Sequence, residues 1–183
     1  MMKLYIKNMS TKSCIMIVGK ILSELMIPHE PVQMGYVVLL ADLSEEQQQY
    51  LQAALAHCEL AILHNRKEIL TEQVKSIIIC MIRNSEEMPG VKSSVYIIRH
   101  FPLTYTYISK LFYKETGITI CRFIINLKME YAKELLDDGY TLDDIAYKLG
   151  YNDAAHLSKI FKKTTGLTPR EYRQSSQKNR SGL

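Results

Sequence analysis

Two segments of the sequence repeat one another, and this repeat restricts the fold more than any other feature. The first is Ile108-Ser-Lys-Leu-Phe-Tyr-Lys-Glu-Thr-Gly-Ile-Thr119, and the second, which begins 49 residues later, is Leu157-Ser-Lys-Ile-Phe-Lys-Lys-Thr-Thr-Gly-Leu-Thr168. Seven of the twelve positions are identical, and three more exchange isoleucine with leucine. Apolar residues recur at intervals of three and four in each copy, which predicts an amphipathic helix with a polar outer side.

Each copy follows another short helical segment and a turn. Residues 94–100 precede the turn at 101–104, and residues 142–149 precede the turn at 150–153. A helix, a tight turn and a second helix with a polar outer side form a helix-turn-helix, whose second helix lies in the major groove of DNA. Two such units, joined by a long helix at 120–136, are predicted to enter successive major grooves about one turn (~34 Å) apart.

The second half of the chain is predicted to be entirely helical. Glycine follows four of the periodic segments, at the position where a helix commonly ends in a left-handed residue. Thr141 with Asp144 and Thr168 with Glu171 form capping-box patterns that begin helices, and Met88-Pro89-Gly90 interrupts the first helix. The seven predicted helices are 71–83, 94–100, 105–116, 120–136, 142–149, 154–165 and 169–173.

Charge is distributed unevenly along the chain. Residues 1–70 hold six Lys/Arg and seven Asp/Glu, a net charge of −1, whereas residues 71–183 hold 17 and 12, a net charge of +5. Between residues 158 and 180 there are seven basic residues and one acid. A basic region predicts a polyanionic partner, with nucleic acid ahead of a membrane surface, although a basic run is also common on an ordinary solvated surface.

The first 66 residues alternate between strand and helix patterns. Strands are predicted at 3–7, 31–34, 36–40 and 58–63, with a tight turn at Gly35. Amphipathic helices are predicted after the first strand and after a capping box at Ser44. The order βαββαβ is that of a ferredoxin-like domain. The predicted fold class is therefore α+β, with a ferredoxin-like domain at 1–66, an all-helical tandem helix-turn-helix domain at 67–176 and a basic, disordered tail at 177–183.

Residues 71–174 resemble the DNA-binding domain of the AraC/XylS family of bacterial transcriptional regulators. The resemblance rests on Ile145-Ala-Tyr-Lys-Leu-Gly-Tyr-Asn-Asp153, Leu157-Ser-Lys-Ile-Phe-Lys-Lys163 and Thr165-Gly-Leu-Thr-Pro-Arg-Glu-Tyr-Arg173. It implies that bases are contacted from the first two turns of each second helix, by Tyr105, Thr106, Ser109, Lys110, Ala154, Ala155, His156, Ser158 and Lys159. Basic residues predicted to contact the flanking phosphates are Lys114, Lys162, Lys163, Arg170 and Arg173.

Several of these positions have an alternative interpretation. Tyr105 is as compatible with packing against the preceding helix as with a base contact, and packing is preferred for Tyr107. His156 either contacts a base or is an ordinary residue of the helix surface. The first unit also departs from the family pattern, because His100-Phe-Pro-Leu103 replaces the usual turn of a small residue and glycine.

The N-terminal domain resembles a heavy-metal-associated domain of the copper-chaperone type. The resemblance lies in the βαββαβ order and in the loop from Met9 to Cys14, where the family pattern has two cysteines. Thr11 occupies the position of the first, and because one thiolate makes a poor Cu(I) site, a domain without metal is the favoured interpretation. A site that uses Met9 and Cys14 is the alternative. The other cysteines are predicted to lie in the core, and they are Cys58, Cys80 and Cys121.

Catalysis and membrane insertion are not indicated by any motif. The histidines lack the spacing of metal ligands, and the sequence contains neither a glycine-rich phosphate loop nor a nucleophile motif. The longest apolar runs have six residues, whereas a membrane-spanning helix needs about 20. The N-terminus lacks the pattern of a signal peptide. We therefore predict a cytoplasmic, non-enzymatic, sequence-specific transcriptional regulator that binds double-stranded DNA, without a cofactor and without membrane attachment.

Other partners and functions stay open at this point. An unknown small-molecule or protein effector of the N-terminal domain, RNA polymerase and a second copy of the chain are candidate partners. One alternative function is metal sensing or a metal-chaperone-like activity through Met9 and Cys14. Another is an architectural or adaptor protein that contacts the polymerase through residues 120–136 and the basic tail.

Overall fold

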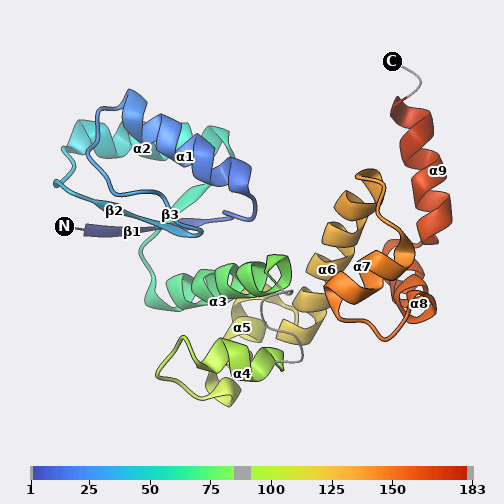
Figure 1. Cartoon of the computed structure of the whole chain (residues 1–183). Helices are drawn as coiled ribbons and strands as arrows, with labels where there is room; N and C mark the ends of the chain where they lie inside the picture. Colours follow the sequence, from blue (N-terminus) through green and yellow to red (C-terminus); the bar gives the residue numbers. More distant parts are fainter. Residues whose placement is uncertain (1, 85–91, 181–183) are drawn as a thin grey trace. The chain divides into compact units, whose positions relative to one another are not determined.

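The computed structural model describes residues 2–84 and 92–180, which form two compact units (Figure 1). Residues 1–79 with 110–115 are called the N-terminal unit, and residues 80–109 with 116–183 the C-terminal unit. Helix α3 (Arg66–Arg83) is continuous from the first unit into the second. The units therefore divide within a helix, whereas the sequence places the domain boundary after residue 66.

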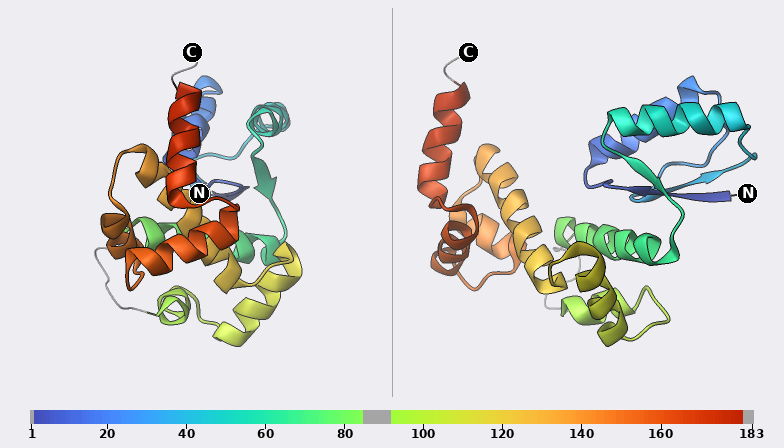
Figure 2. Two further views of the ribbon diagram at one scale, coloured as in Figure 1. Left: turned by 90° about the vertical axis from the view of Figure 1, so that its right-hand side faces the viewer. Right: turned by 180° about the vertical axis from the view of Figure 1, so that it is seen from behind.

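The N-terminal unit contains an antiparallel sheet of three strands in the order β2-β1-β3. The strands are β1 (Met2–Lys7), β2 (Tyr36–Leu39) and β3 (Ala61–Leu63). Helices α1 (Lys12–Glu24) and α2 (Glu45–His57) cover one face of the sheet (Figure 2). Side chains alternate between the two faces of a strand, so every second strand residue enters the core beneath these helices. The core includes Leu4, Ile6, Val18, Leu22, Val37, Leu39, Leu51 and Leu55.

The predicted fourth strand at 31–34 is not formed, and the full βαββαβ arrangement is not confirmed. The segment before β2 pairs with it only through isolated bridges, from His29 to Leu39 and from Gln33 to Tyr36. Pro28 and Pro31 lie in this segment, and proline has no N–H to donate to a ladder, which explains why the pairing does not extend. β3 is also shorter than predicted, because α2 and the turn after it extend to Glu59, whose φ is +58°.

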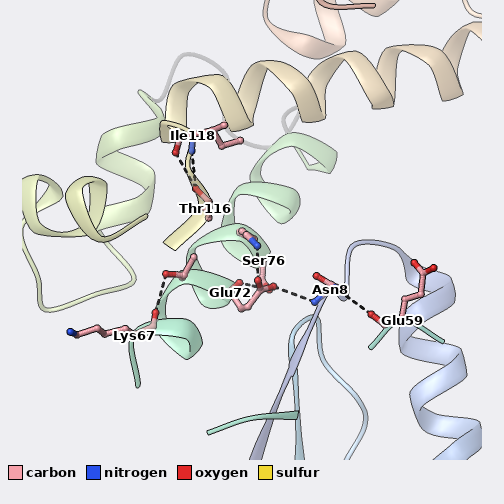
Figure 3. A network of polar contacts seen from close by, with 9 residues as sticks. Asn8, Glu59, Lys67, Glu72, Ser76, Thr116 and Ile118 are labelled. Atoms are coloured by element: carbon pink, nitrogen blue, oxygen red, sulfur yellow. Dashed lines mark hydrogen bonds and ion pairs between the residues drawn. The ribbon is translucent and has the colours of Figure 1, made fainter. Parts of the chain in front are cut away.

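Helix α3 begins at Arg66, five residues before its predicted start, because the Asn65 side chain accepts a hydrogen bond from the Lys67 N–H at 2.9 Å. It lies on the face of the sheet opposite α1 and α2 (Figure 2). The Asn8 N–H donates to the buried Glu72 carboxylate at 3.4 Å (Figure 3). The predicted break at Met88-Pro89-Gly90 lies outside the described residues.

Six further helices follow in the described part of the chain, and three of them have the predicted bounds. They are α4 (Ser93–Ile98), α5 (Tyr105–Thr116), α6 (Ile120–Asp137), α7 (Leu142–Leu149), α8 (Ala154–Thr165) and α9 (Pro169–Arg180). α9 extends beyond its predicted end at Arg173, as far as Arg180. Neither proline nor glycine occurs between Pro169 and Arg180, so nothing in the sequence ends the helix earlier. Residues 181–183 lie outside the described part of the chain.

The exposure of three cysteines differs from the prediction. Cys58, Cys80 and Cys121 are exposed, so their predicted burial is wrong. Cys58 caps the end of α2 and Cys121 lies in the first turn of α6, where neighbouring apolar residues turn inward without them.

In the described residues, no helix combines the length and the apolar character needed to cross a membrane.

Candidate nucleic-acid interface

The second helix-turn-helix comprises α7, a turn at Gly150–Asp153, and α8. Thr141 and Asp144 form the predicted capping box at the start of α7. At its end, Gly150 has a φ of +68°, and the Tyr151 N–H donates to the Ala146 carbonyl at 2.8 Å. Only glycine enters this left-handed region at no steric cost, so the sequence itself dictates a sharp turn here.

Asp153 is the N-cap of helix α8, and its carboxylate accepts a hydrogen bond from the His156 N–H at 2.6 Å. Leu157 and Phe161 are buried and hold the helix against the rest of the C-terminal unit. The predicted base-contacting residues lie in the opposite, outer part of its first two turns. Ala155, His156 and Lys159 are exposed, and Ala154 and Ser158 are half-buried.

The His156 ring is in edge-to-face contact with the Tyr151 ring, with centroids 5.4 Å apart and planes at 87°. This contact connects the turn to the first turn of α8. His156 is thus exposed but held in place, a combination that suits a side chain that meets a ligand in one orientation.

The first helix-turn-helix comprises α4, a turn at 99–104, and α5. Thr104 caps α5 by accepting a hydrogen bond from the Tyr107 N–H at 3.4 Å. The turn contains Pro102 and no glycine, which is the departure from the family pattern that the sequence shows. Along α5, Thr106 and Lys110 are exposed, and Tyr105 and Ser109 are half-buried.

The tyrosines at the start of α5 differ from one another. Tyr107 is 49% exposed. Tyr105 is half-buried; burial, and to a smaller extent the nearby Cys121 thiolate, raise the pKa of its phenol. Tyr105 therefore presents a neutral hydroxyl, which can donate one hydrogen bond and accept another.

The sequence repeat also recurs in the hydrogen bonds at the ends of α5 and α8. Thr116 Oγ1 donates to the Ile118 carbonyl at 3.1 Å (Figure 3), and Thr165 Oγ1 donates to the Leu167 carbonyl at 3.1 Å. Gly117 and Gly166 both adopt positive φ angles, of +73° and +83°. The two copies therefore form the same local structure at the ends of these helices.

Most of the predicted phosphate contacts are available on the surface. Lys114, Lys162, Lys163 and Arg170 are exposed. Within the described residues, the predicted DNA-contacting lysines of α5 and α8 form no salt bridge, although Lys162 interacts electrostatically with the Glu171 carboxylate. Arg173 is different, because it is half-buried and its Nη2 donates to the Tyr140 carbonyl at 2.7 Å.

Sequence reasoning missed two residues of this region. Lys128, on α6, reaches the end of α7 and donates a hydrogen bond to the Leu149 carbonyl. Cys121 is exposed in the first turn of α6 and close enough to Tyr105 and Tyr151 for its thiolate to contribute to the raised pKa of both phenols, after burial. The capping threonine before α6 signals an accessible helix start, but nothing in the sequence indicates the contact of Lys128.

The N-terminal loop shows no metal centre. Met9 is only 3% exposed, and in the described residues no three side chains of the His, Cys, Asp or Glu type come together as metal ligands. Partial burial raises the pKa of the Cys14 thiol, but hydrogen bonds from the Thr11 side chain and neighbouring backbone groups outweigh this effect and lower it. The Thr11 hydroxyl lies 3.3 Å from the Cys14 sulfur.

Comparison with known proteins is consistent with this geometry. Residues 97–175 match the family described as a helix-turn-helix domain. The HTH-type transcriptional activator RhaR of Yersinia pseudotuberculosis is 34% identical over 68 residues, which cover 37% of this chain and 23% of RhaR. The regulatory protein PocR of Salmonella typhimurium is 33% identical over 84 residues, which cover 45% of this chain and 28% of PocR.

A solved structure agrees in fold. The C-terminal domain of AraT, a response regulator from Geobacillus stearothermophilus, aligns with a TM-score of 0.50 and 22% identity over 61% of this chain and 88% of that domain. Residues 97–175 thus form a helix-turn-helix domain. The chain spans about a quarter of the length of RhaR and PocR.

Proposed function

We propose that this protein is a sequence-specific, DNA-binding transcriptional regulator that places α5 and α8 in successive major grooves. The observation that carries the proposal is the structural repeat. Both helices begin at a capping side chain, bury one apolar side and expose polar residues in the first two turns. Those first turns are the part of a second helix that contacts base edges in helix-turn-helix complexes.

Two groups of residues have different roles in this proposal. Lys110 and Lys159 contact guanine O6 and N7, whereas serine and histidine beside them accept or donate to other base edges. Lys114, Lys162, Lys163 and Arg170 contact phosphates and supply affinity that does not depend on sequence. Arg173 serves mainly to attach α9 to the segment between α6 and α7, because its guanidinium donates to the Tyr140 carbonyl.

The N-terminal unit is proposed to respond to an effector or to a protein partner. It is a compact unit, and its helix α3 continues along the chain into the C-terminal unit. A small molecule, RNA polymerase and a second copy of the chain are the partners to test. Metal sensing is not proposed, because Met9 is buried and no second thiol accompanies Cys14 in the loop.

The proposal is tested by selecting bound sequences from a random pool of double-stranded DNA with the full-length protein. We expect one enriched motif with two conserved parts. Lys159→Ala should relax base preference in one part and cost about 1–3 kcal/mol there. Its matched control is Lys163→Ala, on the same helix, which should weaken binding to all sequences alike. A pool without enrichment, or two variants with identical profiles, would contradict the proposal.

A further inference from the structure

Lys128 lies in the middle of α6 and forms an unusual set of contacts. Its ammonium group donates to the carbonyl of Leu149, the last residue of α7, and lies 5.1 Å from the centroid of the Tyr151 ring. Gly150 lies between these two residues, and a Cβ placed there would be 4.0 Å from the Lys128 nitrogen. A single side chain thus contacts the end of α7 and the first two residues of the turn that follows.

Lys128 is a partly buried cation. Among the described residues, no carboxylate forms a salt bridge with it. Burial lowers the pKa of the Lys128 ammonium, as expected for a charge withdrawn from water. Three favourable effects offset that cost: the negative end of the α7 dipole, the carbonyl acceptor and the face of the tyrosine ring. The ammonium group is therefore best stabilised when Leu149, Gly150 and Tyr151 keep their observed positions.

The contact continues beyond the turn. The Tyr151 ring, on which the ammonium group rests, is also in edge-to-face contact with the His156 ring of α8. Lys128, Tyr151 and His156 therefore form a series of contacts from α6, through the turn, to the first turn of α8. That first turn holds three of the residues proposed to contact bases: Ala154, Ala155 and His156.

We propose that Lys128 is a positioning residue for the second helix-turn-helix, which fixes the orientation of the first turn of α8 through Tyr151 and His156. The inference rests on the proposed DNA-binding function, since it concerns base preference in the part of the operator that α8 contacts. The inference gives α6, the helix that joins the two helix-turn-helix units, a role in sequence specificity. Lys128 has this role without contacting DNA.

The test uses full-length Lys128→Met, which keeps an unbranched side chain of similar length but removes the ammonium group. The DNA is the sequence selected by the wild-type protein, with single base changes in either conserved part. Lys128→Met should bind the selected DNA more weakly, because the first turn of α8 is no longer held in one orientation. The variant should also discriminate less against base changes in the conserved part that α8 contacts. Its discrimination against base changes in the part that α5 contacts should equal that of the wild type.

Two further variants separate positioning from a general loss of stability. Lys128→Arg keeps a cation and should restore most of the base preference. Lys133→Met removes another cation from the same helix, one that pairs with Glu130, and should leave base preference unchanged. In a His156→Ala background, Lys128→Met should cost less discrimination than in the wild type, because the contact through which it acts is already missing.

The outcomes distinguish this inference from the proposed function. If the wild-type protein selects no sequence, both are wrong. If it selects a motif in two parts but Lys128→Met keeps full discrimination in the α8 part, only the role of Lys128 is wrong. An equal loss for all DNA sequences, with a salt dependence reduced by about one counterion, would instead show that Lys128 contacts a phosphate and would overturn positioning.

Discussion

Replacing Gly150 by alanine should destabilise the protein by an amount that the backbone alone determines. Gly150 has φ and ψ angles of +68° and +39°, in the left-handed region that costs an alanine about 1–2 kcal/mol. The added Cβ would have only the Lys128 nitrogen within 4 Å, at 4.0 Å, so no steric clash adds to this cost. The expected loss in the free energy of unfolding is therefore about 1–2 kcal/mol.

Gly19→Ala is a control with the opposite sign. Gly19 lies inside α1, and its added Cβ would meet the Val32 side chain at an ordinary 3.8 Å. Alanine is favoured over glycine inside a helix, so this variant should gain about 0.5–1 kcal/mol. The assay is urea denaturation of the full-length protein followed by circular dichroism, since the chain contains no tryptophan. Wild-type stability in Gly150→Ala, or a loss in Gly19→Ala, would refute this reasoning.

Three other predictions follow from the charges and thiols. Affinity for the selected DNA should fall about 10³-fold between 50 and 200 mM salt if about six phosphates are contacted, and a salt-insensitive affinity would contradict the phosphate contacts. Bound DNA should slow alkylation of Cys121 but not of Cys58, which peptide mass spectrometry can measure; equal rates would place Cys121 away from the interface. Because its pKa is lowered, Cys14 should form thiolate and react with iodoacetamide at lower pH than free cysteine does. Thr11→Val should move that pH dependence upward, and no change would exclude the Thr11 hydroxyl as its cause.

The helices of the second helix-turn-helix were predictable because local chemistry sets their ends. The capping box at Thr141 and the glycine at position 150 act within a few residues, so the sequence alone predicts both bounds of α7. The same holds for the start of α8 at Asp153. The outward residues of α8 follow from helical periodicity, once Leu157 and Phe161 are assigned to the core.

Features that depend on distant parts of the chain could not be predicted in this way. The segment at 31–34 has strand-forming residues, but Pro28 and Pro31 limit its pairing with β2. This limit depends on the position of β2 beside the segment, so the residues of the segment alone do not predict it. Exposure of Tyr107 depends on which residues pack around it rather than on its type. Lys128 and Leu149 are 21 residues apart in the sequence, so no local sequence pattern predicts their contact.

Methylation interference on the selected DNA tests the central claim most directly. Methylating guanine N7 blocks the major-groove edge that Lys110 and Lys159 are proposed to contact. If α5 and α8 occupy successive major grooves, interference should occur in two clusters about one helical turn apart. Lys159→Ala should reduce it in one cluster and Lys110→Ala in the other. A single cluster, or interference that neither variant changes, would contradict the account.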